Sequence, residues 1–470
     1  MWVLQEAVLP QVELRAIYGE INGPMAFIEG AGGILRRHHI KGVCCKSLWE
    51  SLPSRQTHIL YRFGAKIEPL AQIRDIVSGA VVQDQIDRLF IILEITRFKE
   101  ATDPHGRIYG LLGLLSDCPN PIDLKPDYYL PVEDLFAQLA YRFLMHFRSF
   151  HKLINHELPL PQSSPLFSLP SWVPHWGHTY GSLTRNILVQ RINSYIAWPS
   201  CSGPPPALIT PAVLQVCAKP LSRVVATTPF FTKENIAKSG ESLSNYIMAL
   251  LKFFLLHLGT RDAAAPYRPA KRPPPTTVSI TQISYVTLAR NNTESEEASE
   301  TIFSAFARTI FGDLLAITDH DVKVANTSFR RFRNSEEAQR AALTLLGDLA
   351  SEGITVGPSL PTSPSDEPVM SVEKAERNFW YANDGRLLFV TEGGYIGSGP
   401  PLMKVGYEVV LVMGSSVPFV LWRRSGEGIP ENQSLWFYAG YAYMHGVMDG
   451  EGAPRMWGEV ERGYLFDGGD

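Results

Sequence analysis

Apolar residues between positions 131 and 153 recur with the spacing of one face of a helix. They fall at 132, 135, 136, 139, 140, 143, 144 and 147, the pattern of a helix that packs against a core. Pro131 suits the first helical position, and Glu133 and Asp134 complement the positive end of the helix dipole. Basic residues in 148–152 complement the negative end of the same helix dipole. The pattern predicts an amphipathic helix over 131–153.

The rest of the chain divides into helical and β-rich parts. Similar apolar patterns predict helices at 84–99, 107–115, 243–258, 299–311 and 335–349. Stretches rich in Pro, Ser or Gly at 198–206, 261–277 and 351–368 are typical of linkers. From about 386 onward, short runs rich in Val, Tyr, Phe and Trp alternate with glycines: RLLFV, YEVVLVM, VPFVLWR and LWFYAGYAYMHGVM. We therefore predict an α+β fold with mainly helical N-terminal and middle regions. A C-terminal antiparallel β-rich unit, a small sheet or partly closed barrel, completes it.

Size and composition narrow the protein class. A chain of 470 residues with 45% hydrophobic residues forms more than one packed core, so two or three domains are expected. A formal net charge of -4 gives no electrostatic reason to expect nucleic acid as a partner. The five cysteines are unlike a secreted disulfide framework, and the start, MWVLQEAVLP, is unlike a signal peptide. The most apolar window, 246–258, is too short to span a bilayer. We expect a cytoplasmic protein without membrane insertion.

Several short patterns suggest chemistry but lack a required part. His38 and His39 lie near Cys44 and Cys45, yet no second pair follows at the spacing of a zinc site. His156-Glu157 begins like a zinc-protease helix, but no second histidine follows at the fourth position and Pro159 would break the helix. Two glycine-rich segments, 30–33 and 397–399, are too short for a phosphate loop and are interpreted as turns. We therefore predict no metal, no cofactor and no catalytic residue.

Two further clusters leave alternatives open. His445 lies near Asp449 and Glu451, so it could transfer protons, or it could be the polar end of a strand entering a turn. The second interpretation is favoured because no nucleophile accompanies the histidine. Trp172 and Trp176 could present an aromatic ligand surface, although such residues more often anchor an irregular loop to a core.

Five segments, in the same order, resemble fungal heterokaryon-incompatibility (HET) proteins. The opening 2–7, WVLQEA, is similar to the segment that closes a HET domain. Residues 103–114, DPHGRIYGLLGL, resemble the family's DxRDRIYALLGL stretch, and 126–129, PDYY, resembles its DY segment. Residues 169–176, LPSWVPHW, resemble LPSWVPDW, and segments within 386–451 resemble the C-terminal β-rich region. The chain departs from the pattern at His105-Gly106, where the family usually has Arg-Asp, and at His175, where it usually has Asp.

The resemblance implies a domain layout. It assigns 1–20 to the remnant of the end of a HET domain and 21–200 to a helical region that follows it. Residues 201–370 form a variable helical region with Pro/Ser-rich linkers, and 371–470 form a β-rich module. The family's N-terminal blocks, resembling YxALSYxWG and LWIDALCINQ, are absent from the sequence, so we expect the chain to lack most of the HET domain.

The resemblance also implies a function. It suggests the recognition or regulatory portion of fungal nonself recognition and incompatibility cell death, acting by protein–protein contact. One alternative is a fragment of a TIR-like nucleotide-hydrolysing enzyme whose catalytic half lies upstream, and another is a decayed paralogue. The family-motif residues, expected to be structural or to mediate interactions, are Trp2, Gln5, Glu6, Asp103, Arg107, Tyr109, Pro170, Trp172, Pro174, Trp176, Gly394, Tyr395, Pro418, Gly446, Asp449 and Gly450.

Overall fold

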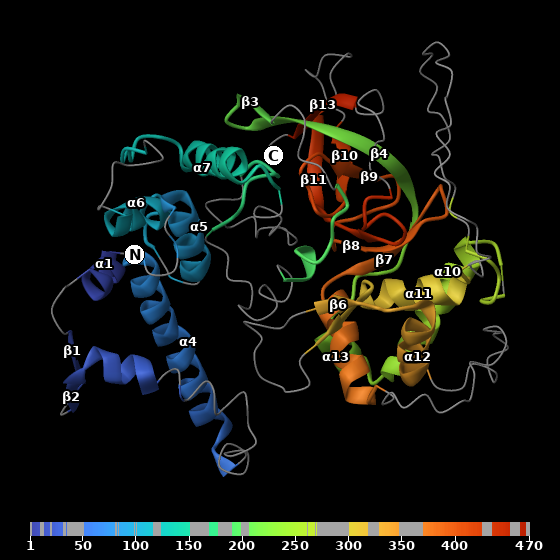
Figure 1. Ribbon diagram of the computed structural model, residues 1–470, viewed down its shortest axis with the longest axis horizontal. Helices are drawn as coiled ribbons and strands as arrows, with labels where there is room; N and C mark the ends of the chain where they lie inside the picture. The colour runs from blue at the N-terminus through green and yellow to red at the C-terminus, as the bar shows by residue number, and fades with distance from the viewer. Residues whose placement is uncertain are drawn as a thin grey trace.

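The computed structural model places an N-terminal group of helices beside a β-rich unit with its own layer of helices (Figure 1). It describes residues 2–9, 14–18, 21–31, 34, 51–79, 82, 84–97, 99, 101–115, 124–150, 169–176, 190–198, 206–260, 262–267, 269, 300–317, 329–346, 370–424, 435–451 and 461–466. The pairs His38-His39, Cys44-Cys45 and His156-Glu157 lie outside these residues, as does most of the three predicted linkers. The interpretations of these segments therefore remain predictions.

The N-terminal part is helical, as predicted. Its helices are α1 (Trp2–Val8), α4 (Ser54–Val77), α5 (Gln85–Thr96), α6 (Gly106–Leu112) and α7 (Val132–Phe147), with the short 3-10 helix η1 (Gly113–Leu115) after α6. A small hairpin of β1 (Arg15–Tyr18) and β2 (Ile21–Pro24) accompanies them. The side chain of Asp84 accepts a hydrogen bond from the Asp87 amide and so starts α5.

Helix α7 confirms the strongest helix prediction but ends earlier than predicted. It stops at Phe147 rather than near 153, because Arg148 adopts a left-handed backbone conformation with φ of 49°. The Arg148 amide still donates to the Leu144 carbonyl, which closes the last turn. The predicted apolar stripe is buried: Leu135, Phe136, Leu139, Ala140, Phe143 and Leu144 are all nearly inaccessible to solvent.

The β-rich unit is built mainly around one long strand, β4 (Val213–Thr227). Its other strands are β3 (Ala207–Thr210), β7 (Leu387–Thr391), β8 (Ile396–Gly399), β9 (Glu408–Val412), β10 (Phe419–Arg424), β11 (Leu435–Tyr441), β12 (Tyr443–Met444) and β13 (Glu461–Phe466). The pairings run β4–β13–β11–β10–β9 and return from β9 to β4, while β7, β8 and β12 extend the sheet from the other end of β4. The α+β fold class is thereby confirmed.

Three features of this unit differ from the sequence prediction. Strand β4 lies within 201–370, for which only helices and linkers were predicted, and it pairs with β13, β9 and β7 in turn. The pair β11–β13 is parallel, so the unit is not antiparallel throughout. Residues 397–399, interpreted as turn glycines, form strand β8 instead.

A layer of helices packs below the sheet in Figure 1. It contains α9 (Lys233–Ser239), α10 (Leu243–His257), α11 (Ile302–Phe311), α12 (Ser335–Leu346) and α13 (Val372–Asn383), with a hairpin of β5 (Leu314–Ala316) and β6 (Phe329–Arg331). The three helices predicted between 243 and 349 are confirmed, whereas α13 was missed. Ser242, Thr301 and Ser371 accept amide hydrogen bonds that begin α10, α11 and α13. Phe254, Phe306 and Phe379 are fully buried in the core of this layer.

Within the described residues, no helix combines the length and the apolar character needed to cross a bilayer.

Candidate functional site

The N-terminal motif residues contact one another. The Gln5 side chain in α1 donates a hydrogen bond of 2.8 Å to the Gly110 carbonyl in α6. It also lies against Gly113, where an added Cβ would come within 2.6 Å of the Gln5 amide nitrogen. Glu6 is exposed on the same helix as Trp2. The first two motifs therefore form one packed unit.

The motif residues of 103–109 make local structural contacts. The Asp103 carboxylate accepts hydrogen bonds from the His105 amide at 2.9 Å and from the His105 ring at 2.7 Å. Arg107 donates to the Lys99 carbonyl at 2.7 Å, and the buried Tyr109 donates to the Asp127 carbonyl at 3.0 Å. Burial lowers the pKa of His105, but its contacts with the Leu130 carbonyl and Asp103 outweigh burial and raise it.

The motif at 169–176 is buried in the N-terminal core. Trp176 is 1% exposed and packs on Phe136 and Phe143 of α7, with ring centroids 5.4 and 5.9 Å apart. Trp172 is also buried and donates to the Ala212 carbonyl at 3.3 Å. Pro170 and Pro174 are buried beside them. These tryptophans serve as packing residues, not as an exposed aromatic surface.

The C-terminal motif residues shape turns of the β-rich unit. Gly394, Gly446 and Gly450 have φ values of 75°, 79° and 88°, which favour glycine. The Tyr395 amide donates to the Thr391 hydroxyl at 3.1 Å, and the Pro418 carbonyl accepts from the Ala442 amide at 2.8 Å. The loop that contains Gly446, Asp449 and Gly450 leads to a polar pocket.

An open pocket of about 740 Å³ lies where this loop meets α11 and the β5–β6 hairpin. It is the candidate functional site. Its ionisable lining residues are the acids Glu300, Asp313, Glu336, Asp449 and Glu451 and the bases Arg308, Arg331 and His445. All three residues of the sequence cluster His445, Asp449 and Glu451 line it, so the structure brings them to one place.

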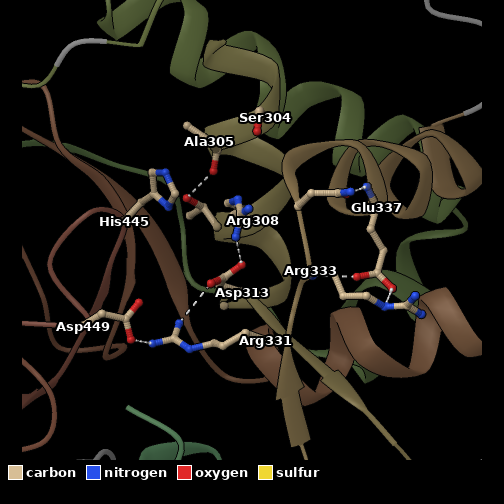
Figure 2. Close-up of polar contacts among 12 residues, drawn as sticks. Ser304, Ala305, Arg308, Asp313, Arg331, Arg333, Glu337, His445 and Asp449 are labelled. Carbon is tan, nitrogen blue, oxygen red and sulfur yellow. Dashed lines mark hydrogen bonds and ion pairs between the residues drawn. The ribbon is translucent and has the colours of Figure 1, made fainter. Parts of the chain in front are cut away.

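A chain of ion pairs runs across the pocket (Figure 2). Arg308 donates to Asp313 at 2.5 Å, and Arg331 donates to the other Asp313 oxygen at 3.1 Å. Arg331 also pairs with Asp449 of the β12 loop, and its guanidinium lies 4.8 Å from the centre of the Tyr195 ring. The network therefore connects the helical layer with the β-rich unit.

His445 is held at the other end of the pocket. Its Nε2 lies 2.8 Å from a Glu300 oxygen, and its Nδ1 lies 3.2 Å from the Tyr443 hydroxyl. The second Glu300 oxygen accepts a hydrogen bond of 2.9 Å from the Ser304 hydroxyl. Glu300 thus stands between the serine and the histidine.

Burial and neighbouring groups have opposite effects on the pKa of each inner carboxyl group, and the balance differs between Glu300 and Asp313. Burial favours a higher pKa for Glu300, but the hydrogen bonds from His445 and Ser304 outweigh it and lower the pKa. Burial raises the pKa of Asp313 despite the opposing charges of Arg308 and Arg331. Burial also raises the pKa of the Tyr443 hydroxyl well above its usual range, so this group stays neutral.

The arrangement does not match a nucleophilic triad. In a triad the histidine lies between the nucleophile and the acid, because it must take the proton from the hydroxyl. Here Glu300 occupies that position, and Ser304 is 1% exposed. The five acids exceed the three bases, so the pocket does not favour phosphate groups either. This chemistry suits the binding of a positively charged group.

Sequence reasoning grouped three of the eight ionisable lining residues and missed the other five. Of those five, Glu300, Arg308 and Glu336 lie in predicted helices and Asp313 and Arg331 lie between them, and Glu300 lies 145 positions from His445. One local signal was present: Asp313 follows Gly312 at the end of α11, and both residues have positive φ. Aspartate is one of the few non-glycine residues that is enriched at positive φ, so Gly312-Asp313 is a recognisable helix-ending pair.

The Glu300 hydrogen bonds predict a pH-dependent contribution to stability. A carboxyl group with a lowered folded-state pKa stabilises the fold above its unfolded pKa, and this contribution disappears as pH falls through the folded pKa. We expect Glu300→Gln to cost on the order of 1–3 kcal/mol at neutral pH, the value of hydrogen bonds to a charged group. The difference from the natural chain should shrink below the usual glutamate pKa of 4.5.

Urea unfolding at a series of pH values between about 6 and 3 tests this expectation. The matched control is Glu234→Gln, because Glu234 is an exposed residue of α9 whose side chain is 74% accessible. A Glu300→Gln difference that stays constant over the whole pH range would contradict the assignment.

Comparisons with known proteins agree with the motifs. Residues 372–462, from the start of α13 into β13, match the family described as the Het-6 beta-barrel domain. A stretch of 68 residues is 37% identical to "Heterokaryon incompatibility protein 6, OR allele" of Neurospora crassa, and it spans 14% of this chain and 9% of that relative. No solved structure matches the chain. The domain match and this relative agree with the ordered motifs, and they support a similarity of this chain to heterokaryon-incompatibility proteins.

Proposed function

We propose that the chain is a recognition or regulatory portion of the machinery for fungal nonself recognition. In this proposal it acts in the cytoplasm by protein–protein contact, and that contact controls incompatibility cell death. The observation that carries the proposal is the acidic pocket, because it lies between a loop of the segment that matches the Het-6 beta-barrel domain and α11.

The charges of the pocket indicate the chemistry of the contact. Asp449 and Glu451 lie at its mouth, where the Asp449 side chain is 58% exposed and Glu451 is exposed as well. Deeper in the pocket, Arg308 and Arg331 pair with Asp313, and Arg331 is shared with Asp449, so the two arginines do not balance all three carboxylates of Asp313, Asp449 and Glu451. The excess negative charge therefore lies on the open side, where it attracts an arginine or lysine side chain of a partner protein.

Neutralising the mouth of the pocket tests this function. Asp449→Asn combined with Glu451→Gln keeps the side-chain sizes and removes two negative charges. Exposed charge pairs contribute up to about 1 kcal/mol each, so partner binding should weaken roughly tenfold. The measurement is the fraction of dying cell compartments, stained with a vital dye, after expression in fungal strains of different incompatibility types.

The control variant is again Glu234→Gln, which removes one exposed carboxylate from α9, outside the pocket lining. The proposal requires that the control retain the strain-dependent response and that the double variant lose most of it. Equal responses from both variants, or no strain-dependent response to the natural chain, would contradict the proposal.

A further inference from the structure

A second group of ionisable side chains lies in the N-terminal part, away from the pocket. Asp84 caps the start of α5, Asp87 lies in its first turn, and His146 lies in the last turn of α7. One ligand atom from each residue falls within 4.8 Å of the other two. The sequence gives no hint of this group, because His146 is at least 59 positions away from both aspartates.

The two acids lie within ion-pair distance of His146, but both distances are longer than that of a short hydrogen bond. His146 Nε2 lies 3.3 Å from an Asp84 oxygen and 3.4 Å from an Asp87 oxygen. A charge-assisted hydrogen bond between such groups is about 2.7–2.9 Å long. In a tetrahedral zinc site with bonds of about 2.1 Å, neighbouring ligand atoms lie about 3.4 Å apart. Both measured distances have the length of a tetrahedron edge.

The protein backbone holds these ligands in place. Asp84 accepts the Asp87 amide at 2.9 Å, so both acids belong to one fixed helix start. His146 contacts the Phe147 ring at 5.0 Å between centroids, and Phe147 contacts Phe90 of α5 at 5.2 Å. The aromatic contact between Phe147 and Phe90 therefore joins the two helices next to the ligand group. Such a contact holds the ligands in position before a metal binds.

We propose that Asp84, Asp87 and His146 bind a zinc ion that joins the start of α5 to the end of α7. The two carboxylates and one imidazole are common zinc ligands, and the partly exposed position leaves room for a water molecule as the fourth ligand. The ion would connect α5 to α7, on which Trp176 packs, so it would stabilise the N-terminal part. This site is independent of the function proposed above.

Zinc titration of the purified full chain by calorimetry tests the proposal, with cobalt(II) as a spectroscopic probe. The test variants are His146→Gln and Asp87→Asn. The matched control is His257→Gln, which changes an exposed histidine in the last turn of α10. Asparagine keeps the shape of aspartate, and glutamine replaces a partly exposed histidine by an uncharged polar side chain, so the variants should fold.

The expected result is a zinc-binding event that weakens at least about tenfold in both test variants, since losing even a supporting residue has this effect. Zinc should also raise the midpoint of thermal unfolding of the natural chain and of the control variant, but not of His146→Gln. The natural chain and the control should give the visible spectrum of tetrahedral cobalt. No zinc binding, or binding and a cobalt spectrum that are unchanged in His146→Gln, would overturn the proposal and leave a simple ion pair.

Discussion

Trp176→Ala should destabilise the N-terminal part by about 3–5 kcal/mol, the usual cost of truncating a buried tryptophan. The side chain is 1% exposed and is among the largest fully buried ones in the described structure. Its removal leaves a cavity against Phe136 and Phe143 of α7, which relaxation of the surroundings fills only in part. Urea unfolding followed by circular dichroism measures the loss.

Tyr129→Ala provides the control, because the Tyr129 side chain is 99% exposed in the turn before α7. Its truncation should change the free energy of unfolding by no more than about 0.5 kcal/mol. A cost below about 1 kcal/mol for Trp176→Ala would contradict the buried packing of the motif. It would revive the interpretation of Trp172 and Trp176 as an exposed aromatic surface.

Helices with a one-sided apolar stripe were predictable because the stripe is a local property. In α7 every predicted stripe position from 135 to 144 is buried, and only the end of the helix differs. That end depends on Arg148, whose left-handed conformation goes with tertiary contacts: the Gly414 carbonyl accepts from the Phe150 amide and the Ser149 hydroxyl. The sequence near 148 carries no glycine that would have signalled the turn.

Strand β4 was missed although a signal was present. Leu214, Val216 and Ala218 alternate with less buried positions, which is the period of a strand. Pro220 interrupts this pattern, and proline usually argues against a central strand. In the structure the pairing of β4 with β9 shifts its register between Pro220 and Ser222, and this irregularity accommodates the proline.

The candidate site was only partly predictable from the sequence, and the reason differs from the one that applies to β4. His445, Asp449 and Glu451 are close in sequence, so their grouping could be noticed. Their partners depend on how α11 and the β5–β6 hairpin dock on the β-rich unit, and no local pattern encodes that docking. The pairing of Arg331 with Asp449 joins residues 118 positions apart. Charged residues at such distances become a site only through the tertiary fold.

Gly397→Ala is expected to destabilise the β-rich unit because strand β8 has no room for a methyl group. A Cβ on Gly397 would lie 2.5 Å from the Phe389 ring and even closer to the Tyr443 carbonyl oxygen. The carbonyl belongs to β12, which pairs with β8 through Met444 and Gly397. Overpacking of this kind costs about 1–3 kcal/mol and more where backbone must move. Thermal unfolding of the two proteins measures the loss.

Gly106→Ala makes the same chemical change where a Cβ would meet no atom within 4 Å. Gly106 begins α6, so alanine there should leave stability unchanged or raise it by up to about 1 kcal/mol. Equal effects of the two substitutions would show that β8 and β12 are not packed as described.

A second substitution separates the two obstacles to a methyl group at Gly397. Phe389→Leu replaces the ring that the methyl group would meet with a smaller side chain, but it leaves the Tyr443 carbonyl in place. The double variant should therefore be more stable than the sum of the single effects predicts, by on the order of 1 kcal/mol, as is usual for residues in contact. The remaining loss belongs to the backbone of β12.

Because β12 leads into His445 and the pocket loop, displacing it should also weaken the pairing of His445 with Glu300. The pH dependence predicted for Glu300 should then become smaller in Gly397→Ala, whereas simple loss of packing elsewhere in the sheet would leave it unchanged.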